Sequence, residues 1–211
     1  MKFALLAGLA ATALAACSTT LQTYSSAQHE TLRLEAHELR EGGLAFLTPS
    51  AVTGREEDTQ ALAHVFAATL RSERPDLRVV ALPYTLSEVN RAGLAGTYRG
   101  MYQDYRDTGV FDAAALRRVA DAAGVRFLAQ IKLAEVHQGA RGRLNLLGLS
   151  LLQTHYANLR VLLQVWDSRD GSIAWEGLDE VTFAIDSQRE RPITFRAIAA
   201  HAAKDLITRL P

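Results

Sequence analysis

The sequence has few of the features that usually identify an enzyme or a nucleic-acid-binding protein. It holds one cysteine in 211 residues, so no intramolecular disulfide can staple the fold, and packing must supply the stability. Its 23 basic residues are balanced by 23 acidic ones, for a formal net charge of zero. That balance gives no electrostatic footprint for nucleic acid, and we expect no such partner.

The common catalytic motifs are missing as well. The sequence contains neither a G-x-x-x-x-G-K-[ST] phosphate loop nor a G-x-G-x-x-G pattern, and Gly148 to Leu152 lacks the second glycine of a nucleophile elbow. None of the six histidines has another four residues away, the spacing that places two imidazoles on one metal ion. We therefore expect a protein that is not an enzyme, with no catalytic residues, no metal and no cofactor.

The N-terminus carries the clearest pattern of the chain. Lys2 gives it a positive start, the apolar stretch 3–16 is too short to span a membrane, and small residues up to Ala16 precede Cys17. A charged start, a short apolar run and a small-residue cleavage site are typical of a secretory signal peptide. We interpret 1–16 as a signal peptide that is cleaved between Ala16 and Cys17.

The junction resembles the lipobox of bacterial lipoproteins, in which the cysteine is diacylated and becomes the new N-terminus. The resemblance implies that Cys17 is lipidated and that the protein is held on a bilayer, because several acyl chains anchor a protein stably. Ser18 stands where an aspartate would favour retention in the inner membrane. The resemblance thus implies an outer-membrane anchor on the periplasmic face of a Gram-negative bacterium. The alternative is an ordinary secreted protein with a cysteine at the junction.

After the cysteine, the sequence divides into a polar segment and one domain. Ser18 to Gln28 is rich in serine and threonine, so we expect a flexible tether, with 17–42 preceding the domain. The pattern from Thr31 to Leu39 suits a strand or a short helix. The remainder, 43–211, is long enough for a single domain with a sizeable core.

Hydrophobic periodicity in this domain predicts the order βαβααβββα, an α/β (α+β) fold with a mixed sheet packed against helices. The first two strands should be parallel across a crossover helix, and the last three should form an antiparallel meander. The expected strands are Leu44–Leu47, Leu77–Leu82, Val125–Val136, Ala157–Trp166 and Ile173–Ile185. The expected helices run from the Thr53/Glu56 capping box to Arg74, from the Thr85/Glu88 capping box to Asp107, from Asp112 to Ala123, and from Ile193 to Leu210.

Glycines interrupt the second of these helices. Gly93, Gly96 and Gly100 each cost a helix about 1 kcal/mol relative to alanine. Three of them in one predicted helix indicate close packing, a kink or a break into two pieces.

A tyrosine stripe on the same helix is the first candidate for binding a partner. Tyr98, Tyr102 and Tyr105 recur at helical spacing, and aromatic side chains are common anchors at protein interfaces. The same spacing is also typical of the core-facing side of a helix. The sequence leaves both interpretations open.

The segment from Gln138 to His155 is the second candidate. Its polar part contains Arg141 and Arg143, and a leucine-rich stretch that includes Leu149 follows. We consider a docking arm, a membrane-inserting hairpin or an irregular hairpin packed on the domain.

The lipobox, the element order and the turn Asp167–Gly171 followed by Ile173–Gly177 together resemble a group of bacterial envelope lipoproteins. These share the fold of the N-terminal domain of the Tol-Pal β-propeller protein, as do the curli secretion channel lipoprotein and the lipoprotein activators of penicillin-binding proteins. The resemblance covers about Leu44–Leu210. It implies a non-enzymatic domain that binds other envelope proteins or assembles with itself.

The expected function is therefore a non-catalytic protein-binding module in cell-envelope assembly or maintenance, with an envelope protein as partner. A homo-oligomeric secretion or channel component is the first alternative. A pore is disfavoured because the alternation around Leu146-Leu147 and Leu151-Leu152 is imperfect for a barrel strand. An envelope hydrolase with an unrecognised site is the second alternative.

Overall fold

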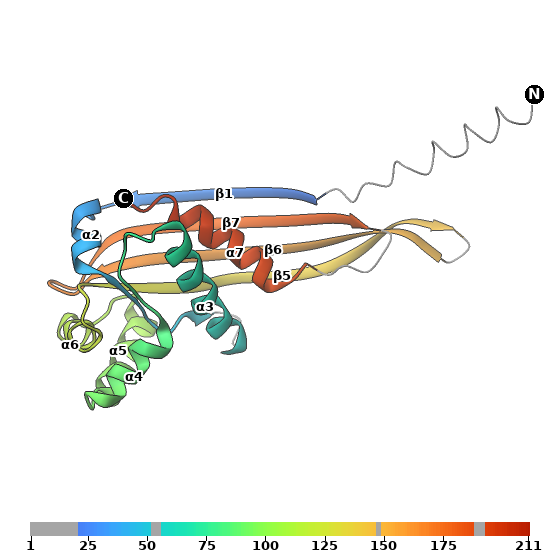
Figure 1. Ribbon diagram of the computed structural model, residues 1–211. Helices are drawn as coiled ribbons and strands as arrows, with labels where there is room; N and C mark the ends of the chain where they lie inside the picture. The colour runs from blue at the N-terminus through green and yellow to red at the C-terminus, as the bar shows by residue number, and fades with distance from the viewer. Residues whose placement is uncertain (1–20, 52–55, 147–148, 188–192) are drawn as a thin grey trace, which may run out of the picture.

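The computed structural model describes residues 21–51, 56–146, 149–187 and 193–211; within these, the side chains of 21, 56–58, 141–146, 149–153 and 186–187 lie outside the description. Seven strands of this part form one sheet in the order β1-β7-β6-β5-β2-β4, and β3 pairs with β5. Helices lie on both sides of it (Figure 1). The predicted α/β fold class is confirmed.

Three long antiparallel strands form the centre of the sheet. These are β5 (Phe127–Leu146), β6 (Leu149–Asp167) and β7 (Ser172–Ser187). Beside them, β2 (Leu44–Phe46) runs parallel to β5 and to β4 (Val79–Val80). The meander and the parallel pair are thus confirmed. The predicted strand Leu77–Leu82 is shorter than expected.

The expected tether is the main correction. Residues Leu21–Thr31 form strand β1, which pairs antiparallel with β7. Leu21 lies opposite Ile185 at one end of the pairing, and Thr31 lies opposite Trp175 at the other. Helix α2 (Ala36–Gly42) follows, so the described fold includes a strand and a helix between residues 21 and 42, where a tether was expected. The sequence gives no hydrophobic pattern for β1, because β1 is an edge strand and none of its side chains from residue 22 to 31 is buried. Its polar composition therefore resembles that of a linker.

The predicted helix from Thr85 to Asp107 is two helices, α4 (Leu82–Arg91) and α5 (Ala95–Thr108). They separate at Gly93, whose φ of 69° lies in the left-handed region that glycine adopts without strain. The cap at Thr85 is wrong, since Thr85 is buried within α4 and donates its hydroxyl to the Ala81 carbonyl. Proline in the first turn of α4 marks the true start.

The other helices follow their predictions closely. They are α3 (Glu56–Glu73), α6 (Ala113–Ala123) and α7 (Phe195–Ile207). Asp112 caps α6 as expected, because its side chain accepts a hydrogen bond from the Ala115 N–H, and Gly124 ends the helix in the left-handed conformation. Thr53 of the first capping box lies outside the described residues. A two-residue strand, β3 (Ser50–Ala51), was not predicted.

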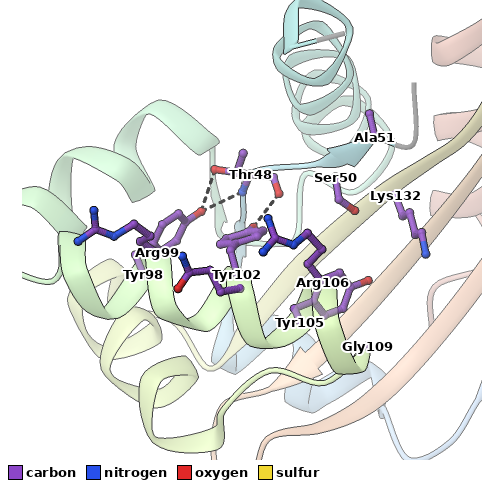
Figure 2. A pocket seen from close by; sticks show the side chains of 11 residues that line it. Thr48, Ser50, Ala51, Tyr98, Arg99, Tyr102, Tyr105, Arg106, Gly109 and Lys132 are labelled. Atoms are coloured by element: carbon purple, nitrogen blue, oxygen red, sulfur yellow. Dashed lines mark hydrogen bonds between the residues drawn. The ribbon is translucent and has the colours of Figure 1, made fainter. Parts of the chain in front are cut away.

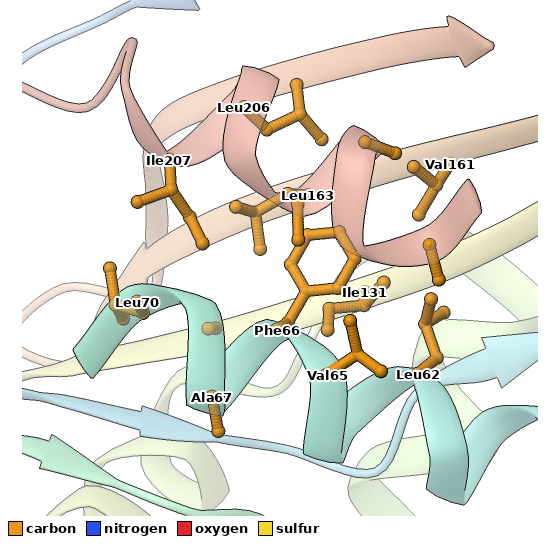
Figure 3. Packing of buried hydrophobic residues seen from close by; sticks show 14 of the residues in the cluster. Leu62, Val65, Phe66, Ala67, Leu70, Ile131, Val161, Leu163, Leu206 and Ile207 are labelled. Atoms are coloured by element: carbon orange, nitrogen blue, oxygen red, sulfur yellow. The ribbon is translucent and has the colours of Figure 1, made fainter. Parts of the chain in front are cut away.

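Helices α3 and α7 pack on one face of the sheet and form the larger core (Figure 3). Phe66 of α3 is fully buried and points toward Ile131 and Leu163 of the sheet, while Leu206 and Ile207 of α7 close the same space. Helices α4, α5 and α6 cover part of the opposite face, and a second, separate cluster of buried residues forms there. The sheet therefore separates the two cores and contributes buried side chains to both.

An ion cluster fastens α2 to the sheet. The Arg126 guanidinium lies 2.7 Å from Glu38 of α2 and 2.6 Å from Asp167 at the end of β6. The hydrogen bond from Arg126 lowers the pKa of Glu38. Burial alone would raise the pKa of Asp167, but Arg126 and the Arg169 N–H hold it below its ordinary value. All three groups therefore stay charged at neutral pH.

The segment 138–155 belongs to a hairpin that continues β5 and β6 beyond the helices (Figure 1). The pairing of β5 with β6 continues until Leu146 lies opposite Leu149. The register shifts between Leu133 and Glu135 and again after Gly142. In the part of the chain that the structure covers, no helix is both long and apolar enough to cross a membrane.

Candidate functional site

A cleft of about 880 Å³ opens between α5 and the strands β3 and β5 (Figure 2). Helix α5 supplies its aromatic floor and two arginines, and β5 supplies a lysine from the opposite side. Its size is in the range of natural ligand-binding clefts. The lining residues are Thr48, Ser50, Ala51, Tyr98, Arg99, Tyr102, Gln103, Tyr105, Arg106, Gly109 and Lys132.

The floor is built by the tyrosine stripe. Tyr98, Tyr102 and Tyr105 stand at helical spacing on the side of α5 that faces the sheet. The rings of Tyr98 and Tyr102 pack 5.0 Å apart, and Tyr105 stacks on Phe111 with centroids 4.3 Å apart. Trp166 of β6 packs edge-on against Phe111 at 5.1 Å. Tyr102 and Tyr105 thus pack on Phe111, and Tyr98 packs on Tyr102.

Two tyrosine hydroxyls hold the backbone that follows β2. The Tyr98 hydroxyl accepts a hydrogen bond of 2.9 Å from the Thr48 N–H, and the Tyr102 hydroxyl donates one of 2.6 Å to the Thr48 carbonyl. These groups would otherwise need a neighbouring strand, because partly buried backbone groups must be paired. Tyr98 and Tyr102 replace that strand, and so fix α5 to the end of β2.

Two buried glutamines extend the same network into the sheet. Oε1 of Gln130 lies 2.9 Å from the Tyr102 hydroxyl, and its Nε2 donates to the Ile131 carbonyl. The Tyr105 hydroxyl donates to Oε1 of Gln164 over 3.1 Å. Nε2 of Gln164 in turn donates to Glu176. Each hydroxyl of the floor therefore has a fixed partner inside the protein.

The tyrosines remain neutral at physiological pH. Burial raises the pKa of Tyr98, and it raises that of Tyr102 still further. Burial, together with the charge of Glu176, also raises the pKa of Tyr105. A neutral phenol that is already hydrogen-bonded is a poor nucleophile and a poor general base at neutral pH. The floor offers apolar ring surface in place of reactive groups.

The charge of the cleft is one-sided. Arg99, Arg106 and Lys132 line it, whereas no aspartate or glutamate does. Within the described residues, Arg99 and Lys132 form no ion pair, and Nε of Arg106 lies 3.3 Å from Asp107 in a pair that is largely exposed. The cleft is therefore a cationic surface in a chain with no net charge.

A second polar cluster ties β1 to the domain. The Ser25 hydroxyl lies 3.0 Å from the buried carboxylate of Asp179 on β7 and 2.6 Å from that of Asp205 on α7. Nε2 of His201 lies 3.5 Å from Asp205. Burial raises the pKa of Asp179, and the nearby charge of Asp205 adds to this effect. Ser25 lies within hydrogen-bonding distance of both carboxylates and can donate its single hydroxyl proton to one of them at a time, which is the arrangement of a structural link.

The two predicted partner-binding regions do not meet in one site. The three tyrosines lie together in the cleft, where they face the core and line the cavity at once. Arg141 and Arg143 belong to β5 and Leu149 to β6 in the distant hairpin, and their side chains lie outside the described residues. Ala16 and Cys17 also lie outside them. Their roles stay predictions.

Sequence reasoning missed the cationic side chains of the cleft. Arg99 and Arg106 are seven residues apart, so the helical spacing could have placed them on the same side of α5, next to the tyrosine stripe. Lys132 had no such signal, because it alternates with apolar residues in an ordinary strand. In the described part of the chain, no three His, Cys, Asp or Glu residues lie close enough to hold a metal ion.

Comparison with known proteins gives likenesses of fold only. No family model and no curated protein matches the sequence. The PelC dodecamer from Paraburkholderia phytofirmans aligns with a TM-score of 0.46 at 12% identity, over 90% of this chain and 97% of that one.

Two further solved structures align less closely. The lipoprotein GNA1162 from Neisseria meningitidis gives a TM-score of 0.40 at 13% identity, over 80% of this chain and 96% of that one. The LpoB C-terminal domain from Salmonella enterica gives 0.36 at 14%, over 66% and 82%. These values concern the arrangement of elements, and no residue role or assembly is transferred from any of the three.

Proposed function

We propose that the protein is lipid-anchored at Cys17 to the periplasmic face of the outer membrane, and that its domain binds another envelope protein without catalysing a reaction. The observation that carries the proposal is the cationic cleft beside α5. Its floor of neutral, internally bonded tyrosines supports recognition of a partner surface better than it supports chemistry.

The strand register supports binding close to the membrane. Cys17 precedes the start of β1 by four residues, which span at most about 14 Å. Lys132 pairs with Leu162, Leu162 with Leu178, and Leu178 with Gln28 of β1. Gln28 is seven residues beyond the start of β1, or about 23 Å along the strand. A partner that reaches the cleft would thus lie within a few tens of ångströms of the lipid anchor.

Site-specific photo-crosslinking in intact cells tests this proposal. A photoreactive residue replaces Gln103, which lines the cleft, in the full lipidated protein; the matched control replaces its exposed neighbour Asp104, which does not. We expect a discrete adduct with one envelope protein from position 103 and none from position 104. Cys17→Ser should remove the adduct by removing the anchor. Equal adducts at both positions, or none at position 103, would contradict the proposal.

Self-assembly is the second candidate, and β1 favours it. This eleven-residue strand ends the described sheet, and Tyr24 on it is 72% exposed. An open strand edge is a template for pairing with another chain. Analytical ultracentrifugation of the lipidated protein in detergent distinguishes the candidates. A defined oligomer that dissociates in Tyr24→Lys would favour self-assembly, and a monomer in both would eliminate it.

A further inference from the structure

We infer that the cleft beside α5 binds an acidic, extended peptide segment of the partner, and that Arg99, Arg106 and Lys132 contact its carboxylates. The inference rests on the proposed function, because it names the chemistry of the surface that a protein partner would present. It assigns the recognition to three side chains, of which two come from α5 and one from β5.

Charge is the first argument. The cleft gathers three cations and no acidic lining residue, although the whole chain is neutral. The neighbour Asp107 does not neutralise Arg106, since the two side chains are 75% and 66% exposed and such pairs are weak in water. Arg99 and Lys132 form no ion pair with any residue that the structure describes. Three cations are thus available to an anionic partner.

Spacing is the second argument. Arg99 and Arg106 are seven residues apart on α5, about 10 Å along the helix axis. Lys132 stands on the strand side of the cleft (Figure 2). An extended peptide presents side chains on one side about every 7 Å, so carboxylates at alternate positions can reach cations that are spread in this way. Arginine suits this task because its planar fork binds carboxylates in a bidentate manner.

The floor is the third argument, and it fits the apolar side chains of a peptide. The hydroxyls of Tyr98, Tyr102 and Tyr105 are engaged by Thr48, Gln130 and Gln164. They leave ring surface exposed to the cleft, and the polar groups of the lining that remain open to a ligand are mainly those of Ser50, Gln103 and the three cations. A peptide that alternates acidic and apolar residues would place its carboxylates on the cations and its apolar side chains on the rings.

Binding of a defined peptide tests the inference. The probe is a fluorescein-labelled hexapeptide of alternating aspartate and valine, and the reference replaces each aspartate by asparagine. Fluorescence anisotropy with the full lipidated protein in detergent should show at least tenfold tighter binding of the acidic peptide. The affinity should fall as salt rises, because exposed charges are screened.

Variants of the cleft localise the binding. We expect the double variant Arg99→Gln/Arg106→Gln to weaken binding of the acidic peptide at least tenfold, and Lys132→Gln to weaken it further. The matched control is Arg118→Gln/Arg196→Gln, which removes two exposed arginines from α6 and α7. It should bind like the unmodified protein. All four arginines are exposed, so thermal unfolding should show that each variant stays folded.

Several outcomes would overturn the inference. Equal affinity for the acidic and amide peptides would remove the role of charge, and unchanged binding in the double variant would place the site elsewhere. Displacement of the peptide by polygalacturonate or inorganic phosphate at lower concentration than by unlabelled peptide would assign the cleft to a glycan or a phosphate.

The crosslink at position 103 separates this inference from the proposed function. If an envelope protein still crosslinks in the double variant, the partner does not depend on the arginines, and only the inference fails. If the acidic peptide binds as expected but no envelope protein crosslinks in cells, the proposed function fails and the cleft remains an anion-binding site.

Discussion

The two faces of the sheet are covered by different kinds of packing. On the face of α3 and α7, buried aliphatic side chains surround Phe66, and α3 and α7 pack directly against each other. On the face of α4, α5 and α6, tyrosines and buried glutamines form a hydrogen-bonded network around Thr48. Apolar packing fills its space completely, because any gap loses contacts on both sides. The aromatic network instead holds α5 to the end of β2 through hydrogen bonds, and a cleft remains between α5 and the strands β3 and β5.

Under the proposed function, this difference assigns stability to one face of the sheet and recognition of a partner to the other. On the apolar face, the polar pair Ser25 and Asp179 lies at the edge of the sheet, where its hydrogen bond attaches β1 to β7. The aromatic face places polar groups at the centre and cations at the rim. Substitutions on the first face should therefore change the free energy of unfolding, and substitutions toward the rim of the second should change binding.

The largest effect is expected at the centre of the apolar face. Phe66→Ala removes a fully buried ring between α3 and the sheet, and should lower the free energy of unfolding by about 3–5 kcal/mol. Urea denaturation followed by circular dichroism measures it. His64→Ala on the exposed side of the same helix should change stability by less than about 0.5 kcal/mol. A loss below about 1 kcal/mol for Phe66→Ala would show that this face is loosely packed.

A smaller effect is expected in the aromatic network. Tyr102→Phe keeps the ring but removes the hydroxyl that donates to the Thr48 carbonyl, and should cost about 1–2 kcal/mol by leaving that group unpaired. The control is Tyr84→Phe on α4, whose side chain is 69% exposed. If both variants lose equal stability in urea, the Thr48 contact does not hold α5 to β2.

Most of the fold could be predicted because its central elements carry strong local patterns. Val161, Leu163 and Val165 alternate with polar or half-buried residues, and they all face the α7 side. Edge strand β1 could not be predicted in this way, since its stability comes from backbone pairing with a partner about 150 residues away. Pro83 directly follows the predicted strand Leu77–Leu82, and a proline there suits the end of a strand and the first turn of a helix equally; in the structure it lies in the first turn of α4.

The candidate site was only half visible in the sequence. The spacing of Tyr98, Tyr102 and Tyr105 predicts one helix face, but it cannot say that the hydroxyls reach Thr48, Gln130 and Gln164. Those contacts join residues 28 to 59 positions apart, so they depend on how α5 lies against the sheet. The cationic rim appears only when α5 and β5 are placed together.

The polar exception on the apolar face gives a pH-dependent prediction. Because the pKa of Asp179 is raised above its ordinary 3.8, the folded protein binds more protons than the unfolded chain at mildly acidic pH. This group therefore favours folding below about pH 4, and the benefit is lost as pH rises toward 7. Asp179→Asn removes the buried charge, so it should raise the stability at pH 7 more than at pH 4.

The measurement for Asp179→Asn is the difference in unfolding free energy from the unmodified protein between pH 4 and pH 7. The difference should grow with pH. The exposed Asp121→Asn is the control, and it should show no such trend. A difference that stays constant over this range would mean that Asp179 is ionised throughout, stabilised by Ser25 and His201.

The smallest effect on stability is expected at the rim of the aromatic face. Arg99→Gln removes an exposed charge without an ion pair in the described structure, and should change the free energy of unfolding by less than about 0.5 kcal/mol. Urea denaturation beside Tyr102→Phe provides the comparison within one helix. Equal losses in the two variants would mean that the arginine helps to hold α5 in place. A loss in Tyr102→Phe alone would show that Tyr102 holds α5 in place and that Arg99 does not. The arginine would then be available for the proposed binding of a partner.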